Sequence, residues 1–409
     1  MIDVAICVCL WYNLINIFLS GVCIVDYTAQ MENALFEQWD EFDDYNEDYS
    51  SIIEKLNSEN AFRTFGDGLL FFLRKRNPEL TAETAIKYIE ELCEKTGVLK
   101  SDIDSTNTFK NWFKGGPRPK KGEDSRSSVF ALSFALSLTP NETAELFHKV
   151  YLDRAFDYRN INEIIYYYCL NNHKTWDDTN RLIASARIES ADNNDMTVYT
   201  AQIKTDIEAI ANESMLLSYI AKHGHNLEKK SVSAKQILQK LFTEANALAK
   251  DEVTERLAYK NGKEIPVYKS RFEGYDKDSI NFTYEIITDL TVSGPKGTIT
   301  LFKNARLPKE IKNRFPEAVS FSKKDPTYEE LRKLIILLSS YIFWYKMQIA
   351  ERSIDIEDYI EEINVHLNES GFSLMYYGNP YDWMFLYCTL AECPLDAFRG
   401  LLAEALAEE

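Results

Sequence analysis

The sequence predicts a mainly α-helical protein with three parts: a helical bundle in the N-terminal half, a central α+β insert with a small antiparallel sheet, and a C-terminal helical module. Apolar residues recur at helical spacing along most of the 409 residues, 45% of which are hydrophobic. Strand-like sequence occurs only between residues 279 and 302. A chain of this length exceeds one typical core, so we expect two or three cores.

The first 60 residues differ in composition from the rest. Residues 1–30 form an apolar leader that lacks the positively charged start of a signal peptide, and polar residues such as Asp3 interrupt it. Two interpretations stay open: translation starts at Met31, or the leader is a single membrane anchor. Residues 31–60 hold ten acidic residues and one basic residue, Lys55. This composition favours a solvated acidic arm, which is also a candidate surface for a protein partner, over an inhibitor that mimics DNA.

Residues 61–189 are expected to form a helical domain. Thr81–Lys95 places its apolar residues on one helical face, and Gly97 follows as a C-terminal stop. The run Thr139–Glu142 predicts a helix start, because it combines a capping box with proline at the first helical position. Other helices are predicted at 107–114, 127–138, 203–221 and 234–249.

Residues 190–326 form the predicted α+β insert. Two strand-like sequences, 279–290 and 298–302, flank the run Ser293–Gly297, whose glycines and proline are typical of a hairpin turn. From 327 to 409 the pattern is helical again, which predicts the C-terminal helical module.

The C-terminal module contains a possible repeat of residues 141–185, at an offset of 219 residues. In both copies an asparagine can cap a helix, and in the second copy a proline follows it at the first helical position. A duplicated helix pair and a chance match from helical composition both remain open. The matched pairs are Tyr158 with Tyr377, Asn160 with Asn379, Glu163 with Asp382, Tyr168 with Tyr387, Cys169 with Cys388, Asp177 with Asp396, and Leu182 with Leu401.

The run Trp112–Pro119 has the spacing W-x-x-G-x-x-x-P and follows a polar stretch that begins at Ser105. Phe109 lies three residues before the tryptophan, so one face of a short helix can anchor in a core while its polar residues face outward. Together with Ala131–Phe147, this segment resembles the end of a Cro/repressor-like (XRE-type) helix-turn-helix. In that family a recognition helix ends in a tryptophan and a glycine before a basic turn leads to the next apolar helix.

The resemblance implies that this helix and turn bind DNA. Asn and Lys side chains suit base edges, and Ser or Thr suits phosphates. Five basic residues and no acidic residue lie between positions 105 and 121, in a chain whose net charge is -18. A local basic patch is required, because the overall charge repels DNA at long range. The predicted DNA-binding residues are Ser105, Thr106, Asn107, Lys110, Asn111, Lys114, Arg118, Lys120 and Lys121.

We therefore expect a sequence-specific DNA-binding transcriptional regulator that binds double-stranded DNA as a homodimer. Leu307–Ile311 and Asn379–Trp383 also resemble parts of uncharacterised helix-turn-helix proteins from bacterial genomes and mobile elements. The alternative is a protein-interaction or host-defence factor that keeps a helix-turn-helix-like fold without binding DNA.

Catalytic chemistry, a cofactor and a metal are not predicted. The sequence contains no recognised catalytic, phosphate-binding or metal-ligand motif, so we do not expect an enzyme. Seven cysteines without a C-x-x-C pair indicate reduced thiols, which predicts a cytoplasmic location. Membrane contact is expected only if residues 1–30 are translated and act as an anchor.

Overall fold

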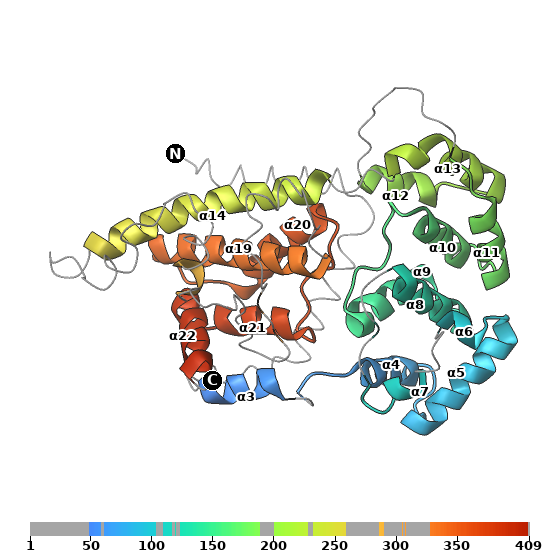
Figure 1. The fold of residues 1–409 in the computed structure, drawn as a ribbon, viewed down its shortest axis with the longest axis horizontal. Helices are drawn as coiled ribbons and strands as arrows, with labels where there is room; N and C mark the ends of the chain where they lie inside the picture. The colour runs from blue at the N-terminus through green and yellow to red at the C-terminus, as the bar shows by residue number, and fades with distance from the viewer. Residues whose placement is uncertain are drawn as a thin grey trace, which may run out of the picture. The chain divides into compact units, whose positions relative to one another are not determined.

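The structure is a computed structural model, and it describes residues 49–58, 61–103, 109–116, 119, 123–188, 200–227, 232–258, 286–289, 305, 307 and 328–407. The α-helices among these residues are labelled in Figure 1. The helices are α3 (Tyr49–Asn57), α4 (Phe65–Arg74), α5 (Ala82–Thr96), α6 (Lys100–Ile103), α7 (Phe109–Trp112), α8 (Glu123–Ala135), α9 (Pro140–Leu146), the π-helix η2 (Phe147–Tyr151), α10 (Ile161–Asn171), α11 (Trp176–Ser185), α12 (Thr200–Glu208), α13 (Glu213–Leu227), α14 (Val232–Ala258), α19 (Tyr328–Ile349), α20 (Ile356–Glu369), α21 (Pro380–Thr389) and α22 (Pro394–Ala407).

The predicted antiparallel sheet is wrong, because the part of the chain that the structure describes contains helices and no strand. Residues 286–288, inside the predicted strand 279–290, form a helical turn and are buried. Arg399 donates hydrogen bonds to the carbonyls of Ile286 (2.6 Å) and Ile287 (3.4 Å), which holds this turn against α22. Tertiary contacts therefore override the β-propensity of the sequence here. The rest of both strand-like sequences lies outside the described residues.

The local helix signals are confirmed. Thr81 and Thr84 form a capping box at the start of α5, and Gly97 ends this helix in the left-handed conformation, with φ of 76°. Thr139 and Glu142 form the predicted capping box of α9, with Pro140 at the first helical position. Each of these signals lies within a few residues of the bonds that it predicts, so packing elsewhere does not alter them.

One hydrophobic core joins α4, α5 and the helices from α8 to α13. Phe130 lies near its centre, with ring centroids 4.5 Å from Phe147 and 4.6 Å from Tyr166. Ile203 from α12 and Leu216 from α13 are fully buried in the same core. The described N-terminal part of the predicted central insert therefore packs as an extension of the first helical domain.

A second core surrounds the side chain of Trp344 on α19. Its ring lies 5.9 Å from Tyr359 of α20, 5.7 Å from Phe385 of α21 and 5.8 Å from Phe398 of α22. Helix α14 packs along α19 and α20 and contributes Glu252, which binds Arg399 at 2.8 Å. The described remainder of the central insert thus belongs to the C-terminal core.

Helix α3 packs against α22, at the other end of the sequence. It buries Ile52, Ile53 and Leu56, and a Cβ added at Gly400 would lie 2.7 Å from the ring of Tyr49. Residues 49–57 are therefore part of a core and are not a solvated arm. The remainder of the predicted arm, up to residue 48, and the leader at 1–30 lie outside the described residues. Within the described ranges, no helix is both long and apolar enough to cross a membrane.

His148 on η2 is buried, with 8% of its surface exposed and its ring centroid 5.1 Å from that of Tyr376. Burial lowers its pKa from 6.5 to about 3, and the positive charges of Arg332 and Lys149 act in the same direction. The folded protein therefore keeps this side chain neutral at pH values where the unfolded chain protonates it.

Stability is expected to fall through this group as the pH drops below 6.5, by about 2 kcal/mol between pH 7 and pH 5. Urea unfolding at pH 7 and pH 5 measures this loss. Between the two pH values, the free energy of unfolding of His148→Asn should fall by about 2 kcal/mol less than that of the parent protein. His173→Asn is the matched control, because His173 is exposed. Equal pH dependence in the parent and both variants would contradict the prediction.

Candidate nucleic-acid interface

Helix α7 is a single turn that packs against α4. The side chain of Trp112 is 6% exposed, and its ring packs edge-on against Phe65 with the centroids 4.8 Å apart. Gly66 permits this approach, because a Cβ at that position would lie 1.9 Å from the carbonyl oxygen of Trp112. The backbone of α7 thus lies directly on α4, and the predicted anchoring role of Trp112 is confirmed.

Two glycines end the turn. Gly115 has a φ of 77°, in the left-handed region, and the amide of Gly116 donates to the carbonyl of Asn111 at 2.7 Å. The amide of Lys114 donates to the same carbonyl at 3.0 Å. The helix predicted at 107–114 therefore ends at Trp112, two residues earlier than expected, because its last residues close a turn instead of continuing the helix.

The structure exposes Lys110, Asn111 and Lys114, the three predicted DNA-binding residues that it describes. Lys110 and Asn111 come from α7, and Lys114 comes from the turn after it. Three donor-bearing side chains thus lie on the outside of a segment whose tryptophan is in the core. Six predicted contacts lie outside the described residues: Ser105, Thr106, Asn107, Arg118, Lys120 and Lys121.

Helix α6, which precedes α7, is held to the core by an acidic side chain. Asp102 accepts hydrogen bonds from the indole nitrogen of Trp176 on α11, at 2.8 Å, and from the amide of Leu99, at 3.2 Å. Ile103 is buried, and Lys100 is exposed beside Glu90, at 3.1 Å. This helix was not predicted from the sequence, because four residues are too few to show a periodicity.

Basic residues at the end of α4 bind acceptors within the protein. Arg76 donates to the carbonyl of Leu136 and to Glu142, both at 2.6 Å, and Lys75 binds Glu145 at 2.5 Å. Burial raises the pKa of Glu142, but hydrogen bonds from Thr139 and Arg76 outweigh burial and lower the pKa below 4.5. The carboxylates of Glu142 and Glu145 on α9 are therefore ionised and paired with these two cations, while Lys110 and Lys114 are exposed on α7 and its turn.

Two further features of the sequence have structural roles. The aromatic residues at 166–168 and at 341–345 are buried, as expected for core. Helix α13 continues through Gly224 to Leu227, and Gly224 packs against Ile188. Across the described ranges, no group of three or more His, Cys, Asp and Glu residues could hold a metal ion. Comparisons with protein families, curated proteins and solved structures found no match to the chain.

Proposed function

We propose that the chain is a DNA-binding regulator that contacts duplex DNA through α7 and the turn after it. The observation that carries this proposal is the exposure of Lys110, Asn111 and Lys114 on a segment whose Trp112 is buried. Contacts to base edges require side chains held at fixed positions, and the packing of α7 on α4 supplies that rigidity. An asparagine can read adenine with two hydrogen bonds, while lysines bind guanine or phosphate.

Electrostatics favours contact at this segment. The net charge of -18 repels phosphate at long range, whereas residues 105–121 carry five cations and no acidic side chain. Each phosphate contact contributes roughly -0.9 to the slope of log K against log salt. We therefore propose short-range docking in the cytoplasm, by a homodimer that pairs two such segments on two half-sites.

Removing the described contacts should weaken DNA binding and reduce its dependence on salt. The variant K110A/N111A/K114A loses two cations, so the slope of log K against log salt should become shallower by about 1.8. Fluorescence anisotropy over a range of KCl concentrations, with the full chain and a duplex from upstream of its own coding sequence, measures this slope. An unrelated duplex of equal length separates sequence-specific from general binding.

The matched control is K222A/K240A, which removes two exposed lysines from α13 and α14 and should leave the slope unchanged. The proposal is wrong if the parent protein shows no salt-dependent binding to either duplex, or if both variants behave alike. Absence of DNA binding would favour the alternative, a protein-interaction factor with a helix-turn-helix-like fold.

A further inference from the structure

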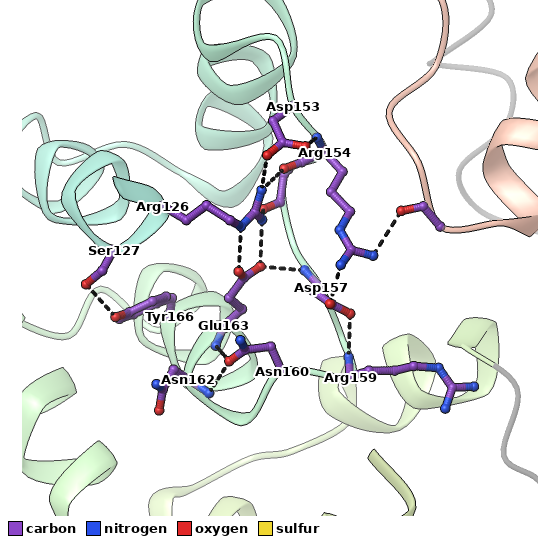
Figure 2. A network of polar contacts seen from close by, with 12 residues as sticks. Arg126, Ser127, Asp153, Arg154, Asp157, Arg159, Asn160, Asn162, Glu163 and Tyr166 are labelled. Carbon is purple, nitrogen blue, oxygen red and sulfur yellow. Dashed lines mark hydrogen bonds and ion pairs between the residues drawn. The ribbon is translucent and has the colours of Figure 1, made fainter. Parts of the chain in front are cut away.

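Arg126 on α8 holds the loop before α10 through a network of buried polar contacts (Figure 2). Its guanidinium binds Glu163 with two hydrogen bonds, Nε to Oε1 at 2.7 Å and Nη2 to Oε2 at 2.8 Å. The same group donates to the carbonyls of Arg154, at 3.0 Å, and Ala155, at 2.8 Å. Arg126 thus binds both Glu163, in the first turn of α10, and two residues of the loop that precedes this helix.

Arg332 on α19 makes the same set of contacts in the C-terminal module. It binds Asp382 with two hydrogen bonds, Nη1 to Oδ1 at 2.8 Å and Nη2 to Oδ2 at 2.7 Å. It also donates to the carbonyls of Ser373 and Leu374, both at 2.9 Å. Asp382 is fully buried, and Arg332 is 4% exposed.

Three partners of Arg126 have a counterpart among the partners of Arg332. Asp382, Ser373 and Leu374 each lie 219 residues after the partner of the same role in the first module, which is the offset of the sequence repeat. Neither pair of loop carbonyls was part of that repeat, because their side chains differ. Chance similarity in helical composition predicts no agreement between hydrogen-bond acceptors on the backbone.

The carboxylates also bind the loop backbone at equivalent positions. The amide of Asp157 donates to Glu163 at 2.6 Å, and the amide of Tyr376 donates to Asp382 at 2.9 Å. The carbonyls of the same two loop residues then accept from the amides of the helix-capping asparagines at 160 and 379, both at 2.8 Å. Two turns of the same form therefore precede α10 and α21.

The left-handed residue that begins each loop falls at the same offset. Leu152 ends η2 with a φ of 59°, and Gly371 follows α20 with a φ of 72°. A leucine rarely adopts this conformation. The preference of glycine for positive φ therefore does not explain why both loops begin with a left-handed residue. The order of elements is also the same: α8, α9 with η2, α10 and α11 match α19, α20, α21 and α22.

We infer that residues 123–185 and 328–407 are two copies of one four-helix module, each closed by an arginine, 11% exposed at Arg126 and 4% at Arg332, that clamps the loop between its second and third helices. Arg126 with Glu163 and Arg332 with Asp382 are the equivalent clamps. The two clamps differ in one partner, since Asp153 adds a second carboxylate to Arg126 where the C-terminal copy has Phe372. The first loop also contacts the second, because Arg154 donates to the carbonyl of Gly371 at 2.9 Å.

The test measures hydrogen exchange of two equivalent amides, Asp157 and Tyr376, in the full chain. Glu163→Gln should speed exchange at Asp157 by roughly tenfold or more, with little effect at Tyr376. Asp382→Asn should have the reverse effect. Glu163→Asp and Asp382→Glu install the carboxylate of the other copy and should preserve most of the protection.

Glu83→Gln, at an exposed position on α5, is the control and should affect neither amide. Circular dichroism of each variant checks that the helices remain. If Glu163→Gln or Asp382→Asn does not fold, the variants Glu163→Asp and Asp382→Glu still give a result. The inference is overturned if only one of the two backbone amides loses protection when its carboxylate is replaced. It is also overturned if Glu163→Asp and Asp382→Glu remove as much protection as Glu163→Gln and Asp382→Asn.

Discussion

Replacing Trp112 by alanine is expected to lower the free energy of unfolding by about 3–5 kcal/mol and to abolish DNA binding. The indole is buried against Phe65, and its removal leaves a cavity directly below the exposed residues of α7. Urea unfolding measures the first effect, and anisotropy with duplex DNA under native conditions measures the second. Trp112→Phe should retain much of both, because an aromatic ring still fills part of the site.

Phe71→Ala is the control for this prediction. Phe71 lies on α4, as Phe65 does, but it is 50% exposed and contacts the guanidinium of Arg63 at 4.1 Å. Its loss should cost about 1 kcal/mol or less, with DNA binding unchanged. Equal losses of stability in the two alanine variants would contradict the anchoring role. Retained DNA binding in a destabilised Trp112→Ala protein would show that α7 is not the contact.

Replacing Arg332 by methionine is expected to lower the free energy of unfolding by about 3–5 kcal/mol, because it leaves the buried carboxylate of Asp382 without its cation. The two loop carbonyls at 373 and 374 lose their donor at the same time. Urea unfolding of the full chain, followed by circular dichroism and tryptophan fluorescence, measures the loss.

The double variant R332M/D382L separates the two sources of this cost. Removing both charges avoids the unpaired carboxylate, so the double variant should be more stable than Arg332→Met alone. Arg181→Met is the control, since Arg181 is 51% exposed in its ion pair with Asp178 and should cost about 1 kcal/mol or less. A double variant no more stable than the single one would contradict an electrostatic origin of the loss.

The sequence predicted the features that depend on neighbouring residues. The predicted capping box of Thr139 and Glu142 and the predicted stop at Gly97 are both confirmed. The burial of Trp112 also followed from the local pattern, because an aromatic residue on one face of a polar helix has little alternative to a core position.

Features that depend on distant residues were not predictable in the same way. Residues 286–288 have strand-like sequence, yet the guanidinium of Arg399 holds them in a helical turn. The sequence could not decide between a duplicated helix pair and a chance match, because Arg126 and Arg332 do not lie 219 residues apart. Arg126 precedes its carboxylate by 37 residues and Arg332 precedes its carboxylate by 50, so an ungapped comparison does not align them.

The packing of α3 on α22 has a consequence for the timing of folding. Tyr49 belongs to one of the earliest described parts of the chain, and its partner Gly400 is synthesised about 350 residues later. At about 5–20 residues per second, α3 waits roughly 20–70 s for α22 to be synthesised. During that interval Ile52, Ile53 and Leu56 lack the surface that buries them. The contact between α3 and α22 can therefore form only after α22 has been synthesised, whereas the module that carries α7 can form earlier.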